Sequence, residues 1–369
     1  MIVTGKRGAV KQRAKSLLRL SIIVSIIIML VAVLITKITT DFKNNNSSSA
    51  AQLNSPIRET TTETTIREIP ASAPEQEPDS ALLAFAVISD VHIQSRVNAA
   101  ERFNNALLDL TENIRPKPNA LVINGDLGDG TPEDYALLSR IINNRHLNTE
   151  GNPLWFATIG NHEFYKAYHD PLTNAWKPAG FPNGDTDAKA IERFLAFTRQ
   201  EKVYNDTYIK GYHFIFLGSE KSAMSDKSIG ESAYLSSAQL GWLEKKLQEN
   251  YVQGKPVFVF LHQPLFTNSG NIGNYVVQRE QLYNILKKYR EIILFSGHLH
   301  LALGSKATVR HDVFTIYNAS STSRPISPDF KSQTEKSEGL YVKVFPDRVE
   351  VKGRDFINKT WIFTDVTAF

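Results

Sequence analysis

Residues 84–92 read AFAVISDVH and residues 292–300 read IILFSGHLH, so in both stretches a short apolar run ends in side chains that bind metal ions. Three more apolar runs between them are followed by Gly125-Asp126, by Gly160-Asn161-His162-Glu163 and by a single His262. If these strands form one sheet, the ligands gather at its carboxyl edge, where open α/β sheets place their sites. The pattern therefore predicts a metal-dependent hydrolase.

The N-terminal part of the 369-residue chain differs from the rest in composition. Residues 17–37 are long and apolar enough to cross a bilayer. Residues 1–16 carry basic but no acidic side chains, so the positive-inside rule places them in the cytoplasm and the rest outside the cell. We expect a single-pass protein of the cell membrane whose residues 17–37 are a transmembrane signal anchor. A cleaved signal peptide is the alternative, although no clear cleavage site follows the apolar segment.

Residues 38–81 are rich in Asn, Ser, Thr, Glu and Pro, a composition that predicts a disordered extracytoplasmic stalk. The whole chain has a formal net charge of +4, but residues 38–369 hold 35 basic and 38 acidic side chains, a net charge of −3. A mildly acidic domain does not have the charge expected of a protein that binds long nucleic acids. The absence of cysteine excludes disulfides and thiolate metal sites.

Residues 82–369 are predicted to form one catalytic domain. Strand-like apolar runs recur at residues 84–89, 120–124, 154–159, 212–217, 256–261 and 292–296. Helical patterns alternate with several of them, at residues 98–114, 132–142, 236–248 and 277–289. This alternation predicts a layered α/β fold. A strand at 313–317 and a hairpin formed by 340–345 and 348–353 are expected to join a second sheet packed on the first.

The mixture of carboxylate and imidazole ligands favours Mn, Fe or Zn, because Mg and Ca prefer an all-oxygen shell. An aspartate has two oxygens and can bridge two cations. Two metal ions about 3.5–4 Å apart activate a shared water and hold the oxygens of the group under attack. This geometry suits an in-line attack on phosphorus.

Five short motifs occur in the order DVH, NGDL, GNHE, FLHQPL and SGHLH between Ala84 and His300. Each motif alone is weak evidence, but the ordered set resembles the signature of the calcineurin-like metallophosphoesterases. The resemblance implies a four-layer α-β-β-α sandwich with a dinuclear metal centre. It also implies hydrolysis of a phosphate mono- or diester by direct attack of a metal-bound hydroxide, without a covalent enzyme intermediate.

The resemblance assigns roles to individual residues. It implies that the first metal is held by Asp90, His92 and His300, and that the second is held by Asn161, His262 and His298. Asp126 would bridge the two metals. His162 matches the family's histidine that is not a ligand, contacts the phosphate and can protonate the leaving oxygen.

Neighbouring residues receive more modest interpretations. The purple acid phosphatases have a tyrosine ligand three residues after the bridging aspartate, where this chain has Asp129, so that branch is disfavoured. Asp129 is expected to form a turn or to orient a ligand histidine. Glu163 is expected to be structural, and His169 is a candidate substrate contact. The loops at 165–187 and 263–275 are expected to set specificity, because long irregular loops beside a site usually carry function.

Two other functions compete with the phosphoesterase hypothesis. The first is a catalytically inactive metal-binding surface receptor or scaffold, which would not need the intact His162. The second is a nuclease of the same fold, which the acidic domain disfavours. We expect the substrate to be a phosphorylated small molecule, lipid or cell-wall polymer.

Overall fold

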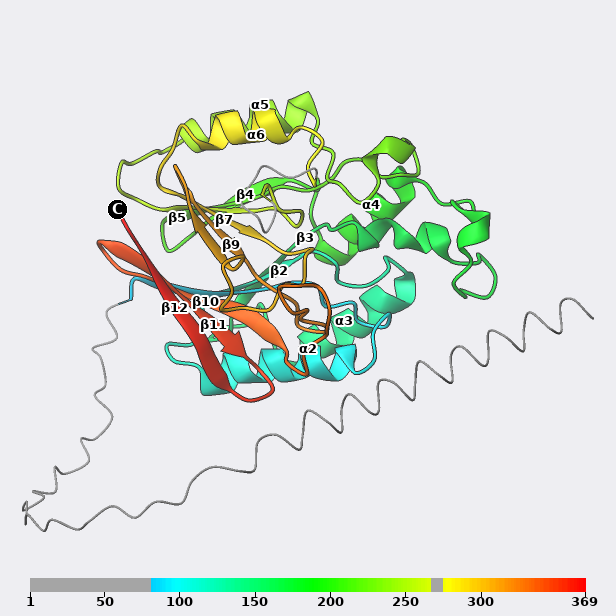
Figure 1. The fold of residues 1–369 in the computed structure, drawn as a ribbon, viewed down its shortest axis with the longest axis horizontal. Coiled ribbons are helices and arrows are strands. Elements are labelled where there is room, and N and C mark those ends of the chain that lie inside the picture. The colour runs from blue at the N-terminus through cyan, green and yellow to red at the C-terminus, as the bar shows by residue number, and fades with distance from the viewer. Residues whose placement is uncertain (1–80, 267–274) are drawn as a thin grey trace, which may run out of the picture. The chain divides into compact units, whose positions relative to one another are not determined.

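The computed structural model describes residues 81–266 and 275–369, which form two six-stranded sheets flanked by helices (Figure 1). The predicted cytoplasmic segment, anchor and nearly all of the predicted stalk lie outside the described residues. Within the described ranges, no helix is both long enough and apolar enough to cross a membrane.

The first sheet has the strand order β12-β11-β10-β1-β2-β3. Its strands are β1 (Leu83–Ile88), β2 (Ala120–Asn124), β3 (Leu154–Thr158), β10 (Glu338–Val344), β11 (Arg348–Asp355) and β12 (Thr360–Ala368). Strands β1, β2 and β3 run parallel, and β10 pairs antiparallel with β1. The C-terminal hairpin was predicted as part of a second sheet. That prediction is wrong, because β10 hydrogen-bonds to the free edge of β1 and extends the sheet that carries the first motifs.

The second sheet has the strand order β4-β5-β6-β7-β9-β8. Its strands are β4 (Asn205–Ile209), β5 (Tyr212–Phe216), β6 (Val257–Phe260), β7 (Ile292–Ser296), β8 (Val309–His311) and β9 (Thr315–Asn318). Strands β5, β6, β7 and β9 run parallel. The condition that all motif-bearing strands form one sheet is therefore not met, since β1, β2 and β3 lie in the first sheet and β6 and β7 lie in this one. The apolar runs identify buried strands, but they do not specify which neighbour each strand pairs with.

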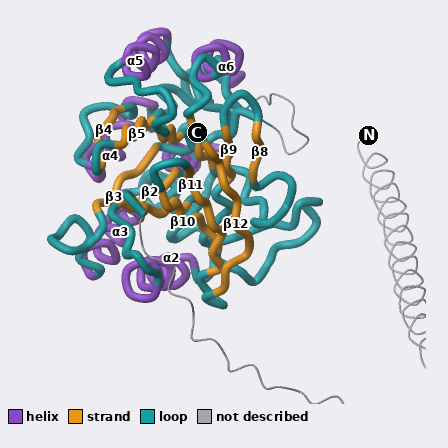
Figure 2. Tube along the Cα trace, turned by 90° about the vertical axis from the view of Figure 1, so that its left-hand side faces the viewer, coloured by secondary structure: helices purple, strands orange, loops and turns teal. Residues whose placement is uncertain are grey.

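Helices cover the outer face of each sheet, so the domain has four layers, α-β-β-α (Figure 2). The first sheet is covered by α2 (Ala99–Leu108), α3 (Pro132–Asn144) and α4 (Asp187–Thr198), and the second by α5 (Ser237–Gln248) and α6 (Arg279–Leu286). The predicted helix at 98–114 ends in a π-helical turn, η1 (Asp109–Asn113). Short 3-10 helices lie at η2 (His162–Tyr168), η3 (Pro178–Gly180) and η4 (Lys227–Ile229). Helix α4 and strands β4, β8 and β12 were not predicted.

The core between the sheets is built from side chains that alternate along the strands. In β1, Leu83, Phe85 and Val87 face the other sheet, whereas the alternate residues face the helices. Because both faces are buried, the strand has a continuous apolar sequence without polar alternation. The ring of Phe85 makes edge-to-face contacts with rings of the opposite sheet, its centroid lying 4.7 Å from Phe258 and 4.9 Å from Phe214.

We predict that Phe85→Ala will lower the free energy of unfolding by about 3–5 kcal/mol, because it removes a fully buried ring and leaves a cavity between the sheets. Denaturant unfolding followed by circular dichroism measures the change. The matched control is Phe330→Ala, since Phe330 is exposed. Its loss should stay within about 0.5 kcal/mol. Equal losses in the two variants would contradict a central role for Phe85.

Candidate metal centre

The strand ends of both sheets converge at one edge of the domain. The structure brings together all eight residues predicted for the site: Asp90, His92, Asp126, Asn161, His162, His262, His298 and His300. Seven of them lie in the loop or turn that follows β1, β2, β3, β6 or β7, and His162 is the first residue of η2, which comes directly after the turn that follows β3.

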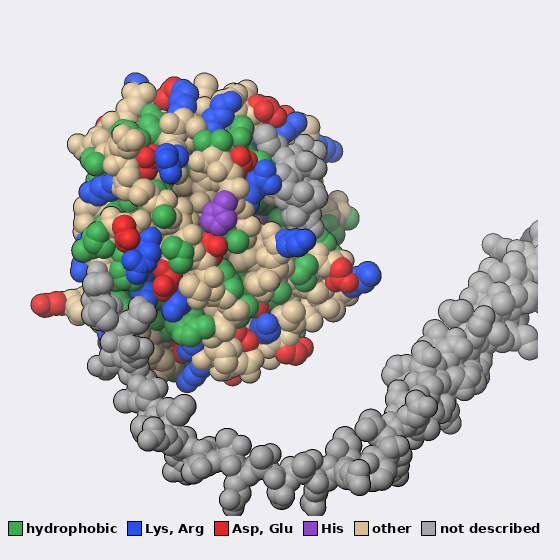
Figure 3. All heavy atoms as spheres, turned by 60° about the vertical axis from the view of Figure 1, so that its left-hand side comes forward, with side chains coloured by type: hydrophobic (Ala, Val, Ile, Leu, Met, Phe, Trp, Pro, Cys, Tyr) green, Lys and Arg blue, Asp and Glu red, His purple; other side chains and the backbone are tan. Residues whose placement is uncertain are grey.

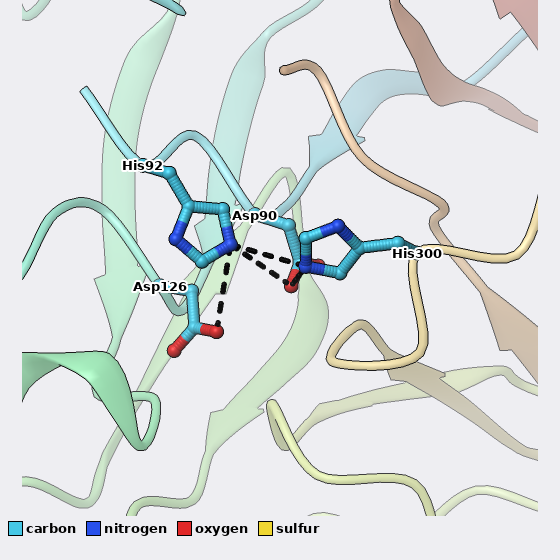
Figure 4. Close-up of side chains that lie close together, drawn as sticks. All are labelled: Asp90, His92, Asp126 and His300. Carbon is cyan, nitrogen blue, oxygen red and sulfur yellow. Dashed lines mark hydrogen bonds and ion pairs between the residues drawn. The ribbon is translucent and has the colours of Figure 1, made fainter. Parts of the chain in front are cut away.

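The first ligand group consists of Asp90, His92, Asp126 and His300, whose ligand atoms all lie within 4.8 Å of one another (Figure 4). His300 Nε2 lies 2.9 Å from Asp90 Oδ1 and 3.0 Å from His92 Nε2. Asp126 Oδ2 is 3.8 Å from His92 Nε2. Four ligand atoms thus face a common point.

The second ligand group consists of Asp126, His262 and His298, again within 4.8 Å of one another. His262 Nε2 lies 3.2 Å from Asp126 Oδ2. The amide oxygen of Asn161 adjoins this group, 3.0 Å from His298 Nδ1. Asp126 is the one residue that the two groups share, and this is the position that a bridging carboxylate requires.

The chemistry of these residues fits bound cations. Asp90 Oδ1 and His262 Nε2 are buried, and the polar atoms beside them belong to other members of the two groups, His300 Nε2 at 2.9 Å and Asp126 Oδ2 at 3.2 Å. Burial opposes ionisation of Asp90, but His300 and His262 hold its pKa at about 2. Burial likewise opposes a charge on His262, but Asp126 and Asp90 raise its pKa to about 10. Buried carboxylates therefore demand positive charge at the centre, which metal ions supply when bound. A mixed oxygen and imidazole shell suits Mn, Fe or Zn.

Backbone carbonyls orient two of the imidazoles. His262 Nδ1 donates to the carbonyl of Asn124 over 2.7 Å, and His300 Nδ1 donates to that of Arg324 over 3.1 Å. Each bond fixes the tautomer in which Nε2 carries the free lone pair and is available to a metal.

The ligand-bearing loops adopt strained backbone conformations. Five of the predicted ligands have positive φ angles, from 46° to 70°: Asp90, His92, Asp126, His298 and His300. Such left-handed residues are uncommon outside glycine and gather at functional sites. Close packing also dictates the glycines of two motifs. A Cβ on Gly125 would lie 2.4 Å from the His262 ring, and one on Gly297 would lie 2.6 Å from Asp90 Oδ2.

Glu163 has a structural role, as predicted. Its buried carboxylate accepts hydrogen bonds from the backbone amides of Gly160 at 2.6 Å, Leu127 at 2.8 Å and Asp126 at 3.1 Å. It thereby ties the turn after β2 to the turn after β3. Burial, together with the charge of Asp126, raises the pKa of Glu163 to about 7.

His162 lies beside the first ligand group, and its ring meets that of His92 edge-on with centroids 4.4 Å apart. Its Nδ1 lies 2.9 Å from Asp129 Oδ1, so Asp129 orients His162 and not one of the predicted ligands. Burial opposes protonation of His162, but the charges of Asp126 and Asp129 raise its pKa. His169 was a candidate substrate contact, and it lines the cleft described below. Its Nε2 lies 3.2 Å from Asp129 Oδ2, and its Nδ1 is hydrogen-bonded to the carbonyl of Asn174.

A cleft of about 540 Å³ opens over His162. It is lined by Ser95, Arg96, Asp129, His162, Tyr165, His169, Trp176 and Glu231. Tyr165 and Glu231 were not singled out from the sequence. The Tyr165 ring lies 3.9 Å from that of His162, and its hydroxyl donates to Glu231 over 2.6 Å. The aromatic content of the 165–187 loop was the signal for Tyr165, whereas nothing in the local sequence marks Glu231.

An α/β sandwich that gathers carboxylate and imidazole ligands at its strand ends is the framework of a metal-dependent hydrolase. The family profile of the calcineurin-like phosphoesterases matches residues 83–302. The chain belongs to this family and is, by class, a phosphoric ester hydrolase. A dinuclear metal centre is expected for this family, and the two groups of Asp and His side chains described above could hold it.

The fold is similar to that of a dimetal phosphatase from Danio rerio, with 14% identity, a TM-score of 0.54 and coverage of 78% of this chain and 99% of the other. It is also similar to purple acid phosphatase PPD1 from yellow lupin, with 12% identity, a TM-score of 0.49 and coverage of 78% of this chain and 53% of the other. At these identities the similarity concerns the fold alone. No curated protein matches the sequence.

We predict that Asp126→Asn will reduce metal content at both sites, because one carboxylate serves both ligand groups. Metal analysis of the purified variant should give well under two ions per chain, the number expected for a dinuclear centre. The matched control is Asp347→Asn, which makes the same substitution at an exposed turn and should leave metal content unchanged. Two metals retained in the Asp126 variant would rule out the bridging role.

Proposed function

We propose that this protein hydrolyses phosphate mono- or diesters outside the cell, at a dinuclear centre formed by the seven predicted ligands. The observation that carries the proposal is the position of Asp126 between two groups of ligands, with His162 beside them. When bound, two metal ions activate a water and hold the phosphate oxygens.

The chain itself supplies the proton for the leaving group. Asp129 holds Nδ1 of His162, so Nε2 is the nitrogen left to carry the transferable proton. The backbone amide of His162 also donates to Asp126 Oδ1 over 2.9 Å, which fixes the histidine relative to the bridging carboxylate. A general acid placed in this way contributes about 10²–10⁴ in rate.

Two alternatives fit the observations less well. An inactive receptor or scaffold would have no use for the His162–Asp129 side-chain pair, which belongs to neither of the two ligand groups and lines the cleft. A nuclease acting on long nucleic acids would need a continuous basic surface. On the face shown in Figure 3, Lys and Arg side chains are interspersed with Asp and Glu.

The role of His162 can be tested with esters of rising leaving-group pKa. We predict that the wild-type protein, loaded with Mn, Zn or Fe, turns over nitrophenyl phosphate esters, and that His162→Ala keeps its metal but loses about 10²–10⁴ in kcat. The loss should shrink for good leaving groups such as nitrophenolate, because they need little protonation. Asp129→Asn, which weakens the orienting contact, should show the same trend with a smaller loss.

Several outcomes would count against this assignment. A wild-type protein that turns over no ester with any of these metals would refute the proposed function. An equal loss across the whole ester series would show that His162 binds phosphate and is not the acid. Loss of metal from His162→Ala would make it a ligand.

We further propose that residues 17–37 anchor the chain in the cell membrane and that the catalytic domain faces outward. The support is the basic charge of residues 1–16 and the polar composition of residues 38–81. Protease added to intact cells should cut in residues 38–81 and release a soluble, active fragment. Protection of that segment until the cells are lysed would show that the orientation is reversed.

A further inference from the structure

We propose that Arg96 and Arg324 form an anion-binding subsite next to the metal centre, which takes a second phosphate group on the substrate. This inference rests on the proposed phosphoesterase function and narrows its substrate class to phosphate esters that carry a further phosphate.

The two arginines lie beside the catalytic cleft. Arg96 lines this cleft together with His162, and it also lines an adjoining pocket of about 350 Å³. Arg324 also lines the adjoining pocket, and its carbonyl accepts the hydrogen bond from His300 Nδ1. A residue of the pocket is thus bonded directly to a predicted metal ligand. Ser95, like Arg96, lines both spaces, so the two spaces adjoin.

The charges of the two arginines are not neutralised by the described part of the chain. Within residues 81–266 and 275–369, neither guanidinium forms a salt bridge with a carboxylate. Arg96 donates from Nη1 to the carbonyl of Ser95, and its Nε is buried without a partner among these residues. Arg324 places Nε and Nη2 2.9 and 3.0 Å from the side-chain oxygen of Gln333, in the amide orientation that satisfies both groups. Burial and the neighbouring charge of Arg96 lower the pKa of Arg324.

A third arginine in the same pocket shows the contrast. Arg102 donates to the carbonyl of Ser323 over 2.6 Å and lies 3.4 Å from Glu335. Its charge is thus engaged by the protein, and Glu335 is the carboxylate that offsets it. The positive charge left for a ligand comes from Arg96 and Arg324.

The start of α2 adds to the attraction for an anion. Asn98, the residue that precedes the helix, lines the pocket and makes no side-chain capping bond. The helix dipole favours negative charge at this end of α2, while the amide of Ala99 already donates to the carbonyl of Arg96 and Glu101 adds one negative charge to the first turn. A phosphate has enough oxygens to meet two guanidinium groups and backbone amides at once. A single carboxylate, by contrast, has only two oxygens and pairs with one arginine through two parallel hydrogen bonds, so two arginines favour a phosphate.

The test compares alkyl phosphates with alkanediol bisphosphates of increasing chain length, using the metal-loaded full-length protein. We expect a bisphosphate of suitable length to have a kcat/KM roughly tenfold or more above that of the matching alkyl phosphate, as charge-assisted hydrogen bonds allow. In Arg96→Gln and Arg324→Gln this ratio should fall toward one, mainly through KM. The matched control is Arg140→Gln on the exposed face of α3, which should leave the ratio unchanged.

Calorimetric binding of the bisphosphate gives a readout that does not depend on turnover. Hydrolysis of alkyl phosphates without any preference for bisphosphates would overturn the subsite and leave the proposed function standing. Absence of hydrolysis with intact, arginine-dependent bisphosphate binding would overturn the proposed function instead. A ratio that survives in the double variant, or an equal gain with ω-carboxyalkyl phosphates, would refute a phosphate subsite made by these arginines.

Discussion

The site depends on the apolar packing of the two sheets against each other, in which the ring of Phe85 on β1 contacts phenylalanine rings of the opposite sheet. Each predicted metal position draws ligands from both sheets. The first combines Asp90 and His92, which follow a strand of the first sheet, with His300, which follows a strand of the second. The second position combines Asn161, which follows β3, with the two histidines that follow β6 and β7. A shift of one sheet against the other would separate the ligands of both positions. The apolar interface thus sets the geometry of a polar site that it does not touch.

The backbone of the ligand-bearing loops is strained, because so many candidate ligands converge on one point. Left-handed backbone at five ligand positions is unfavourable by itself and persists only where surrounding contacts over-determine it. The hydroxyls of Ser321 and Ser323 both donate to the carbonyl of Asp90, and Glu163 holds the amides around Asp126. These contacts are buried and come from segments distant in sequence. They fix the ligands before any metal binds, which reduces the ordering that metal binding must impose.

The proposed chemistry divides into separate tasks. The shared carboxylate of Asp126 would bind both metals, and the His162–Asp129 pair would donate a proton to the leaving group. Arg96 and Arg324 would bind the second phosphate of the substrate. Their separation explains why substitutions at each should have different signatures in metal content, leaving-group dependence and substrate preference. An acidic domain can still bind an anionic substrate, because local arginines without carboxylate partners act at short range while distant charges are screened.

The sequence alone determined the types of the candidate ligands, their order and their placement after apolar strands, because strand patterns and motif chemistry are local properties of the chain. It also predicted most strands, the α/β class and, through the family resemblance, the layered sandwich. Only the tertiary structure decided that the motifs lie on two sheets, that β10 pairs with β1, and that Asp129 serves His162. It alone placed Arg324 beside Arg96. Strand pairing and sheet packing depend on which buried faces fit one another across the whole chain, and hydrophobic periodicity carries no record of that choice.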